Sequence, residues 1–178
     1  MRTRVSIREV TDALDGASDE TSSYVNRLTG EVRTVTHEEL RLAEEEDEPE
    51  MPEWQHDAVM AAREVLESKD WLELPSKFDI HEWDIMDRFG QSVPREQEAE
   101  VRNAIREKGA FRLFKGTIRR LGLEDRWFDF KRRVLEDIAR RWLQEHDLQP
   151  SEGAAQPGVA AAGAAPRSFH EEAARVKK

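Results

Sequence analysis

The sequence predicts an α+β fold: a small three-stranded antiparallel sheet packed against five or six helices, with a helix-rich C-terminal half. Two segments rich in β-branched residues, 21–26 and 31–35, flank a turn that contains Gly30, which is typical of a β-hairpin. A hairpin alone is marginal in water, so it needs a further strand, and residues 71–74 before Pro75 supply the best candidate. Beyond residue 52, apolar residues recur mainly at helical spacing.

Capping signatures mark the helices of the N-terminal half. Ser6 precedes an apolar stripe with a glutamate three residues later, and Gly16 can end this helix in the left-handed conformation. Thr36 begins a second capping box, with a helix through about residue 43. A third helix follows Pro52 and carries Trp54 on its predicted buried stripe.

Four further helices are expected in the C-terminal half. Asp79 to Glu82 form a capping signature, Pro94 opens the next helix, and Glu124 begins the longest one. The cleanest amphipathic pattern runs through Phe111, Phe114, Ile118 and Leu121. We expect most of the five tryptophans to lie in or beside the core: Trp54, Trp71, Trp83, Trp127 and Trp142.

One domain over about residues 3–148 accounts for these elements, with an exposed acidic connector at about 44–51. Residues 149–178 are rich in Ala, Gly and Pro and are predicted to form a disordered tail. The chain has no cysteine, no apolar run of membrane-spanning length and no signal-peptide core near Met1. We therefore expect a soluble cytoplasmic protein with no membrane partner and no cofactor.

Charge is unevenly distributed along the chain. Residues 1–101 hold 27 acidic and 11 basic side chains, a net of −16, whereas residues 102–141 hold 6 acidic and 13 basic, a net of +7. Four cations recur at i, i+4, i+7 and i+11, so one helix would present them on one side to phosphates or carboxylates. They are Lys108, Arg112, Lys115 and Arg119.

The alternative for this basic stripe is a solvated helix face that the acidic half of the same chain neutralises. Nucleic acid is possible as a partner but not favoured, because nucleic-acid-binding domains tend to be basic overall and this chain has a net charge of −10. The acidic run 44–50 can likewise be a solvated connector or can contact a basic partner.

Enzymatic signatures are weak in this sequence. His81, Asp84 and Asp87 share one side of a predicted helix and could hold a metal ion only with ligands from elsewhere in the chain. Ser22 and Ser23 lack the Gly-x-Ser-x-Gly motif of a hydrolase elbow, and no P-loop or dinucleotide-binding glycine pattern occurs. The sequence assigns no catalytic residue.

A family resemblance covers roughly residues 3–148. The chain resembles a bacterial family of uncharacterised proteins, number one-five-eight of the UPF series, in seven segments that keep their order and spacing. These segments are ETSSYVN, TGEV, PEWQ, LELP, GAFRLFK, WFDF and IARRW. The resemblance implies a single domain and brings no established activity, cofactor or site residue.

From these patterns we expect a non-catalytic interaction or regulatory module whose basic helical surface meets an anionic partner, either a protein or another polyanion. Two alternatives remain open: a metal-dependent hydrolase or nuclease using His81, Asp84 and Asp87, and a nucleic-acid-binding accessory protein.

Overall fold

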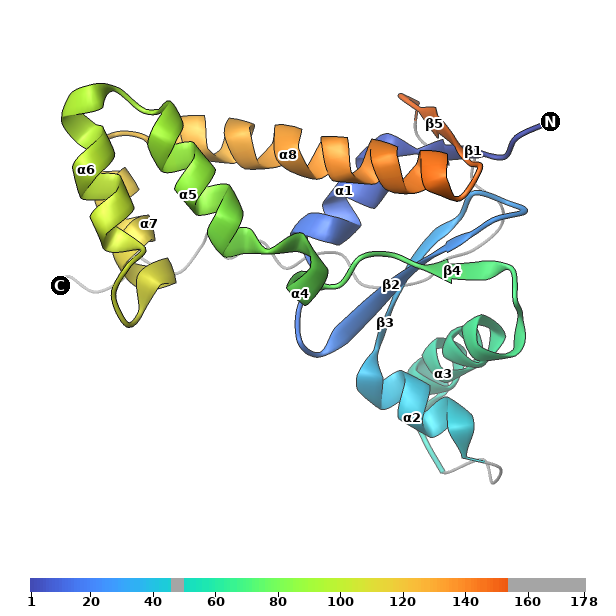
Figure 1. Ribbon diagram of the computed structural model, residues 1–178. Coiled ribbons are helices and arrows are strands. Elements are labelled where there is room, and N and C mark those ends of the chain that lie inside the picture. Colours follow the sequence, from blue (N-terminus) through green and yellow to red (C-terminus); the bar gives the residue numbers. More distant parts are fainter. Residues whose placement is uncertain (46–49, 154–178) are drawn as a thin grey trace, which may run out of the picture.

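A computed structural model describes residues 1–45 and 50–153, and its centre is a three-stranded antiparallel sheet (Figure 1). Strand β2 (Thr21–Asn26) lies in the middle, between β3 (Val32–Thr36) and β4 (Trp71–Glu73). In this register Val25 lies opposite Val32 on one side and Leu72 on the other. The hairpin and its third strand are thus confirmed.

The turn between β2 and β3 depends on Asn26 and Gly30. The Asn26 side-chain oxygen accepts hydrogen bonds from the backbone N–H groups of Leu28 and Thr29 at 2.9 and 3.1 Å. Gly30 adopts a φ of 79°, and a Cβ atom there would lie 2.2 Å from the backbone oxygen of Arg4. Glycine is therefore required by both the backbone conformation and the close approach of the N-terminal strand.

A second, two-stranded sheet joins the start of the chain to its C-terminal part. Strand β1 (Arg4–Ser6) pairs in parallel with β5 (Gln149–Ser151). This corrects the predicted boundary at residue 148, because residues 149–151 belong to the folded unit. Residues 154–178 of the predicted tail, and residues 46–49 of the predicted connector, lie outside the described residues.

The main core forms around the long helix α8 (Glu124–Glu145), which runs along one edge of the molecule (Figure 1). Phe89 lies at its centre, 1% exposed, with edge-to-face contacts to Phe114, Trp127 and Phe130 at centroid distances of 5.3–6.0 Å. Such aromatic pairs stabilise a core beyond their buried area. The helices that contribute to this core are α1 (Ile7–Asp15), α4 (Lys77–Ile80), α5 (Glu82–Ser92), α6 (Arg95–Ala104) and α7 (Ala110–Arg120), together with α8.

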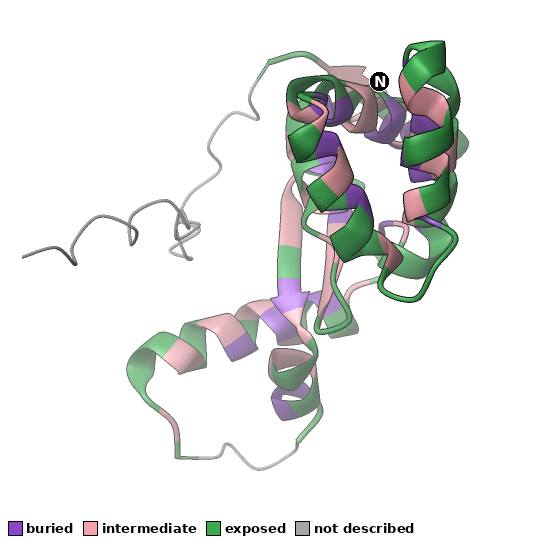
Figure 2. Ribbon diagram, turned by 90° about the vertical axis from the view of Figure 1, so that its left-hand side faces the viewer, coloured by how far each residue is buried: buried purple, intermediate pink, exposed green. Residues whose placement is uncertain are grey.

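Helices α2 (His37–Glu44) and α3 (Glu53–Glu67) form a separate hairpin at the far side of the sheet (Figure 2). Their small core consists of Val35, Leu42, Ala43, Val59 and Ala62. Arg33 attaches this hairpin to the sheet: its guanidinium lies 4.2 Å from the Trp71 ring centroid and donates to the Ala61 carbonyl oxygen at 3.1 Å.

The boundary between α4 (Lys77–Ile80) and α5 differs from the prediction. The capping box uses Ser76 and Asp79, one turn earlier than the predicted Asp79–Glu82 signature. His81 then adopts a left-handed conformation with φ 52° and separates the two helices. Gly16 also differs, because its φ is −84° rather than left-handed. By contrast, the predicted Thr36 capping box is present, with both hydrogen bonds.

Only three of the five tryptophans are buried. Trp71, Trp127 and Trp142 are 4–7% exposed, whereas Trp54 is 74% and Trp83 is 46% exposed. Trp54 lies in the first turn of α3 and is not part of the small core around Val59 and Ala62.

The α+β fold class and the helix-rich C-terminal half are confirmed by this architecture. Among the helices in residues 1–45 and 50–153, none combines the length and apolar character that crossing a membrane requires.

Candidate binding surface on helix α7

Helix α7 is held by one face and leaves its other side in solvent. Gly109 precedes it with a φ of 77°, which lets the chain turn sharply into the helix. Phe114 and Ile118 are 1% and 2% exposed, and Phe114 lies edge-to-face against Trp127 at 4.8 Å. This anchoring fixes which residues of α7 face outward.

The predicted basic stripe lies on the outward side of α7 and the turn before it. Lys108, Arg112, Lys115 and Arg119 are all exposed. Arg119 pairs with Glu124 at 3.1 Å, whereas Lys108, Arg112 and Lys115 form no ion pair with any described residue. Three adjacent cations are therefore available to a ligand, and we call them the basic patch.

Several other cations of the C-terminal half form ion pairs with acidic residues. Lys131 pairs with Asp15 and Glu82, both at 3.0 Å, and Arg132 pairs with Asp12 at 3.6 Å. Further ion pairs join Arg120 to Glu100 and Arg140 to Glu152. Among the described residues, acidic side chains of the N-terminal half thus neutralise some cations of α7 and α8, but not those of the basic patch.

Apolar side chains border the basic patch. Phe111 is 45% and Leu113 is 42% exposed. The sequence predicted Phe111 as a core residue, but it lies at the edge of the buried face, next to the basic stripe around the helix. A surface that combines cations with aromatic and aliphatic groups suits a polypeptide better than a bare phosphate backbone.

The residues of the alternative metal site, His81, Asp84 and Asp87, do not form a metal-binding group. His81 forms the left-handed junction between α4 and α5, while Asp87 pairs with Arg102 at 3.3 Å and accepts a hydrogen bond from Gln91 at 2.9 Å. Within residues 1–45 and 50–153, no three His, Asp or Glu side chains are arranged to hold a metal ion. The geometry gives this alternative no support.

Ser22 and His37 lie closer together than sequence reasoning indicated. The Ser22 hydroxyl and His37 Nε2 are 3.2 Å apart, within hydrogen-bond distance. The contact is on the surface, and no carboxylate among the described residues hydrogen-bonds to the His37 ring. A hydrolase would need such an orienting group and an oxyanion site, so the pair serves here to connect β2 to the start of α2.

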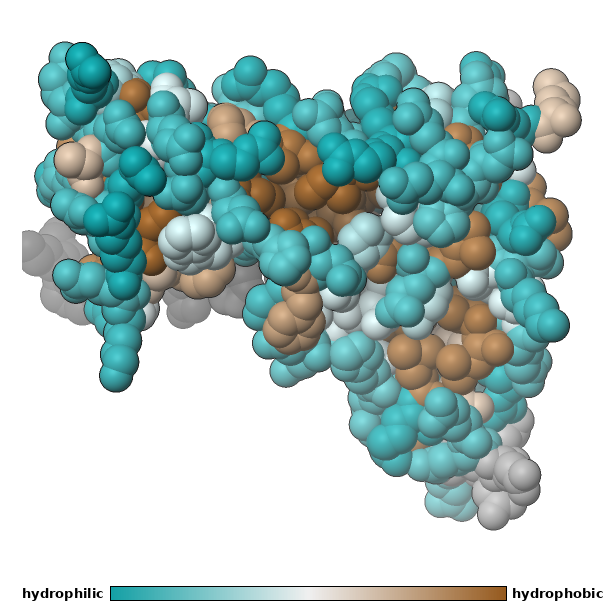
Figure 3. All heavy atoms as spheres, viewed as in Figure 1, coloured by the Kyte–Doolittle hydropathy of each residue, from teal (hydrophilic) through white to brown (hydrophobic). Residues whose placement is uncertain are grey.

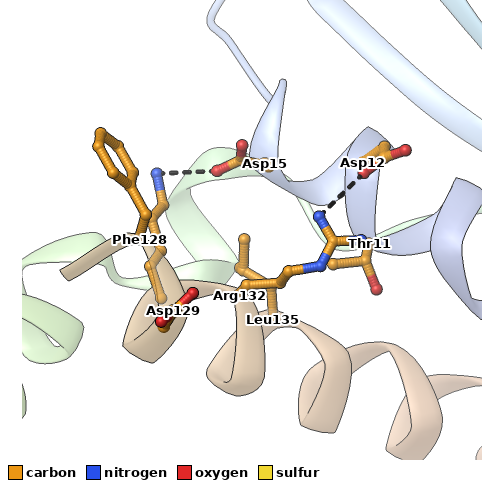
Figure 4. A pocket seen from close by; sticks show the side chains of 8 residues that line it. Thr11, Asp12, Asp15, Phe128, Asp129, Arg132 and Leu135 are labelled. Carbon is orange, nitrogen blue, oxygen red and sulfur yellow. Dashed lines mark ion pairs between the residues drawn. The ribbon is translucent and has the colours of Figure 1, made fainter. Parts of the chain in front are cut away.

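A pocket of about 250 Å³ lies between α1 and α8 and was not predicted (Figure 4). Arg132 reaches toward Asp12 across it, and the ring of Phe128, which is 61% exposed, stands at one end. Both cations of the pocket, Lys131 and Arg132, are paired with carboxylates within the molecule. Its charges therefore contribute to attaching α1 to α8.

Burial and pairing act in opposite directions on the pKa of Lys131. Burial lowers it, but hydrogen bonds to Glu82 and Asp15 outweigh burial and leave the pKa above its ordinary value. Lys131 thus remains charged at physiological pH, as a structural cation rather than as a proton donor.

Comparison of the chain with protein-family models, with curated proteins and with solved structures finds no match. The resemblance to the uncharacterised bacterial family stays a prediction.

Proposed function

We propose that the protein is a non-catalytic interaction module that binds an anionic polypeptide through the basic patch on α7. The observation behind this proposal is that Arg112 and Lys115 on α7, and Lys108 in the turn before it, are exposed and lack ion pairs with described residues, while several other cations of the C-terminal half are paired. Arg119, although paired with Glu124, is on the same side and extends the surface.

The bordering Phe111 and Leu113 favour a polypeptide over nucleic acid. Carboxylates would meet the cations, and apolar side chains of the partner would cover these two residues. The net charge of −10 repels any long polyanion over most of the surface, so it favours an acidic segment that is short or that also carries apolar side chains.

A fluorescence anisotropy titration of the full chain tests the proposal. Labelled polyglutamate, DNA and RNA serve as probes, each at two salt concentrations. Replacing Lys108, Arg112 and Lys115 with alanine should weaken polyglutamate binding at least about tenfold, because charged contacts at an interface are worth several kcal/mol together. Binding should also weaken as salt increases.

A matched control removes the same number of charges elsewhere. Arg4, Lys69 and Arg141 are exposed and form no ion pair with described residues, so their replacement with alanine should leave binding nearly unchanged. Equal losses in the two triple variants, or no binding by the wild type, would contradict the proposal. Tighter binding to DNA or RNA than to polyglutamate would favour a nucleic-acid accessory role.

A further inference from the structure

Helix α3 carries an acidic stripe on the side away from its core. Its buried residues are Val59, Ala62 and Val65, of which the first two belong to the small core. On the opposite side, exposed residues recur at i, i+4, i+7, i+11 and i+14, which places them along one face. They are Glu53, Asp57, Met60, Glu64 and Glu67.

Most of this acidic stripe has no cation beside it. Glu64 pairs with Arg33 at 2.9 Å, while Glu53, Asp57 and Glu67 form no ion pair with any described residue. We call these three residues the acidic patch. Like the basic patch, it consists of three charges on the outer side of a helix whose inner side is anchored.

The two patches are complementary in charge and partly in spacing. On α3 carboxylates occupy positions i, i+4, i+11 and i+14 of the stripe, and Met60 lies at i+7. Glu53 and Asp57 are therefore about one helical turn apart, roughly 5–6 Å, as are Arg112 and Lys115 on α7. When the two helices lie side by side, this pair of carboxylates can meet this pair of cations.

Exposed apolar side chains accompany both patches. Trp54 and Met60 on α3 are 74% and 44% exposed, and Phe111 and Leu113 on α7 are 45% and 42% exposed. Protein interfaces commonly bury aromatic and methionine side chains within a charged and polar rim. Contact between the two helices would therefore bury apolar surface as well as pair charges.

The two patches cannot meet within one molecule. Helices α2 and α3 lie at one end, beyond the sheet, whereas α6 and α7 lie at the other end (Figure 1). The space-filling view in Figure 3 shows hydrophilic surface over much of this face, with one apolar area between the two ends and another at the α3 end. Among residues 1–45 and 50–153, neither patch is therefore the partner of the other within one molecule.

We infer that the acidic patch on α3 of one copy binds the basic patch on α7 of a second copy. This inference rests on the proposed function and names its polypeptide partner as the chain itself. The net charge of −10 makes two copies repel at long range. That repulsion is screened beyond about 8 Å at physiological salt, whereas paired charges in direct contact are screened much less.

Such a contact joins different surfaces of the two copies. It produces lengthening head-to-tail chains, unless the two copies can make both contacts at once and close into a dimer. Sedimentation velocity of the full chain over a range of concentrations detects either product. The wild type should associate at physiological salt and dissociate at high salt.

Charge reversal tests the pairing directly. One variant carries Lys108→Glu, Arg112→Glu and Lys115→Glu, and the other carries Glu53→Lys, Asp57→Lys and Glu67→Lys. Each variant alone should associate at least about tenfold more weakly than the wild type, because like charges then face each other. A mixture of the two should associate again, since every patch then finds its complement.

Circular dichroism and thermal unfolding test whether both variants are folded. If a reversed variant does not fold, neutral replacements (Glu53→Gln, Asp57→Asn and Glu67→Gln, or Lys108→Gln, Arg112→Gln and Lys115→Gln) replace it and should weaken association in the same direction. A wild type that remains monomeric, a reversed variant that associates like the wild type, or a mixture that stays dissociated each overturns the inference.

Polyglutamate binding separates failure of this inference from failure of the proposed function. The acidic-patch variant should still bind polyglutamate through α7, while losing self-association. A chain that binds polyglutamate through the basic patch but stays monomeric has another anionic partner, which overturns only the inference. A wild type that neither binds polyglutamate nor self-associates overturns both the inference and the proposed function.

Discussion

The amino group of Lys131 in α8 donates a hydrogen bond to Glu82 in the first turn of α5, at 3.0 Å. It lies at the same distance from Asp15 at the end of α1. One partly buried cation therefore connects three helices that are far apart in the sequence. Removing it would leave Glu82, whose side chain is 29% exposed, without its counter-charge.

Replacing Lys131 with methionine should lower the free energy of unfolding by about 1–3 kcal/mol, the usual cost of leaving a charged hydrogen-bond partner unsatisfied. Urea unfolding followed by circular dichroism measures this change. Lys115→Met provides the control, because Lys115 is exposed and should shift stability by no more than about 0.5 kcal/mol. Equal effects of the two changes would contradict the role assigned to Lys131.

The contribution of Lys131 should also depend on pH. Burial acts to lower its pKa, but the hydrogen bonds to Glu82 and Asp15 raise it above the ordinary 10.5. A raised pKa in the folded state gives stability that is complete below the unfolded value and is lost as pH rises through the folded value. The stability difference between wild type and Lys131→Met should be constant up to about pH 10 and shrink at higher pH.

The two tryptophans Trp127 and Trp54 should differ strongly in their effect on stability. Trp127→Ala removes a ring that is 4% exposed and should cost about 3–5 kcal/mol. Trp54→Ala removes a ring that is 74% exposed and should change stability by no more than about 0.5 kcal/mol. A large loss on replacing Trp54 would show that it lies in a core, as its sequence pattern alone suggested.

Three glycines allow the free-energy cost of backbone strain to be measured separately from the cost of steric overlap. Gly122→Ala places a side chain at φ 69° with nothing within 4 Å, so it should cost about 1–2 kcal/mol from backbone strain alone. Gly30→Ala adds a contact of 2.2 Å with the Arg4 backbone oxygen and should cost clearly more. Gly116→Ala, within α7 and in open space, should stabilise the protein by about 0.5–1 kcal/mol. Chemical denaturation of the three variants gives the order, and a Gly30 cost equal to that of Gly122 would contradict the close approach.

The N-terminal cap of α2 should have a measurable effect on the free energy of unfolding, because the core shared by α2 and α3 is small. The Thr36 hydroxyl accepts a hydrogen bond from the Glu39 N–H at 3.1 Å, and Thr36→Ala should cost about 1 kcal/mol. Thr36→Ser keeps the hydroxyl and should retain most of that stability. Similar losses in both variants would indicate that the methyl group, rather than the cap, stabilises the helix.

Local and periodic signals in the sequence determined much of this structure. The β-hairpin around Gly30 follows from β-branched residues and one turn glycine, and the start of α2 follows from the Thr36 box, because both involve residues within a few positions of each other. The helical spacing of Phe114 and Ile118 placed the buried face of α7 correctly, because a regular helix converts sequence intervals into directions. The same regularity applies to Arg112, Lys115 and Arg119, whereas Lys108 lies in the turn before α7.

Tertiary contacts decided the remainder. The pairing of β1 with β5 joins residues at distant positions in the sequence, and three-residue strands carry too few side chains to show a period. Trp54 and Phe111 have the same local pattern as buried aromatics, and only the placement of neighbouring elements leaves them exposed. Lys131 and Lys115 are both lysines in a basic region, yet one meets Asp15 and Glu82 while the other meets solvent. Which cations remain free to bind a partner is thus a property of how the helices pack together, since charge neutralisation depends on distance in space and not on position in the chain.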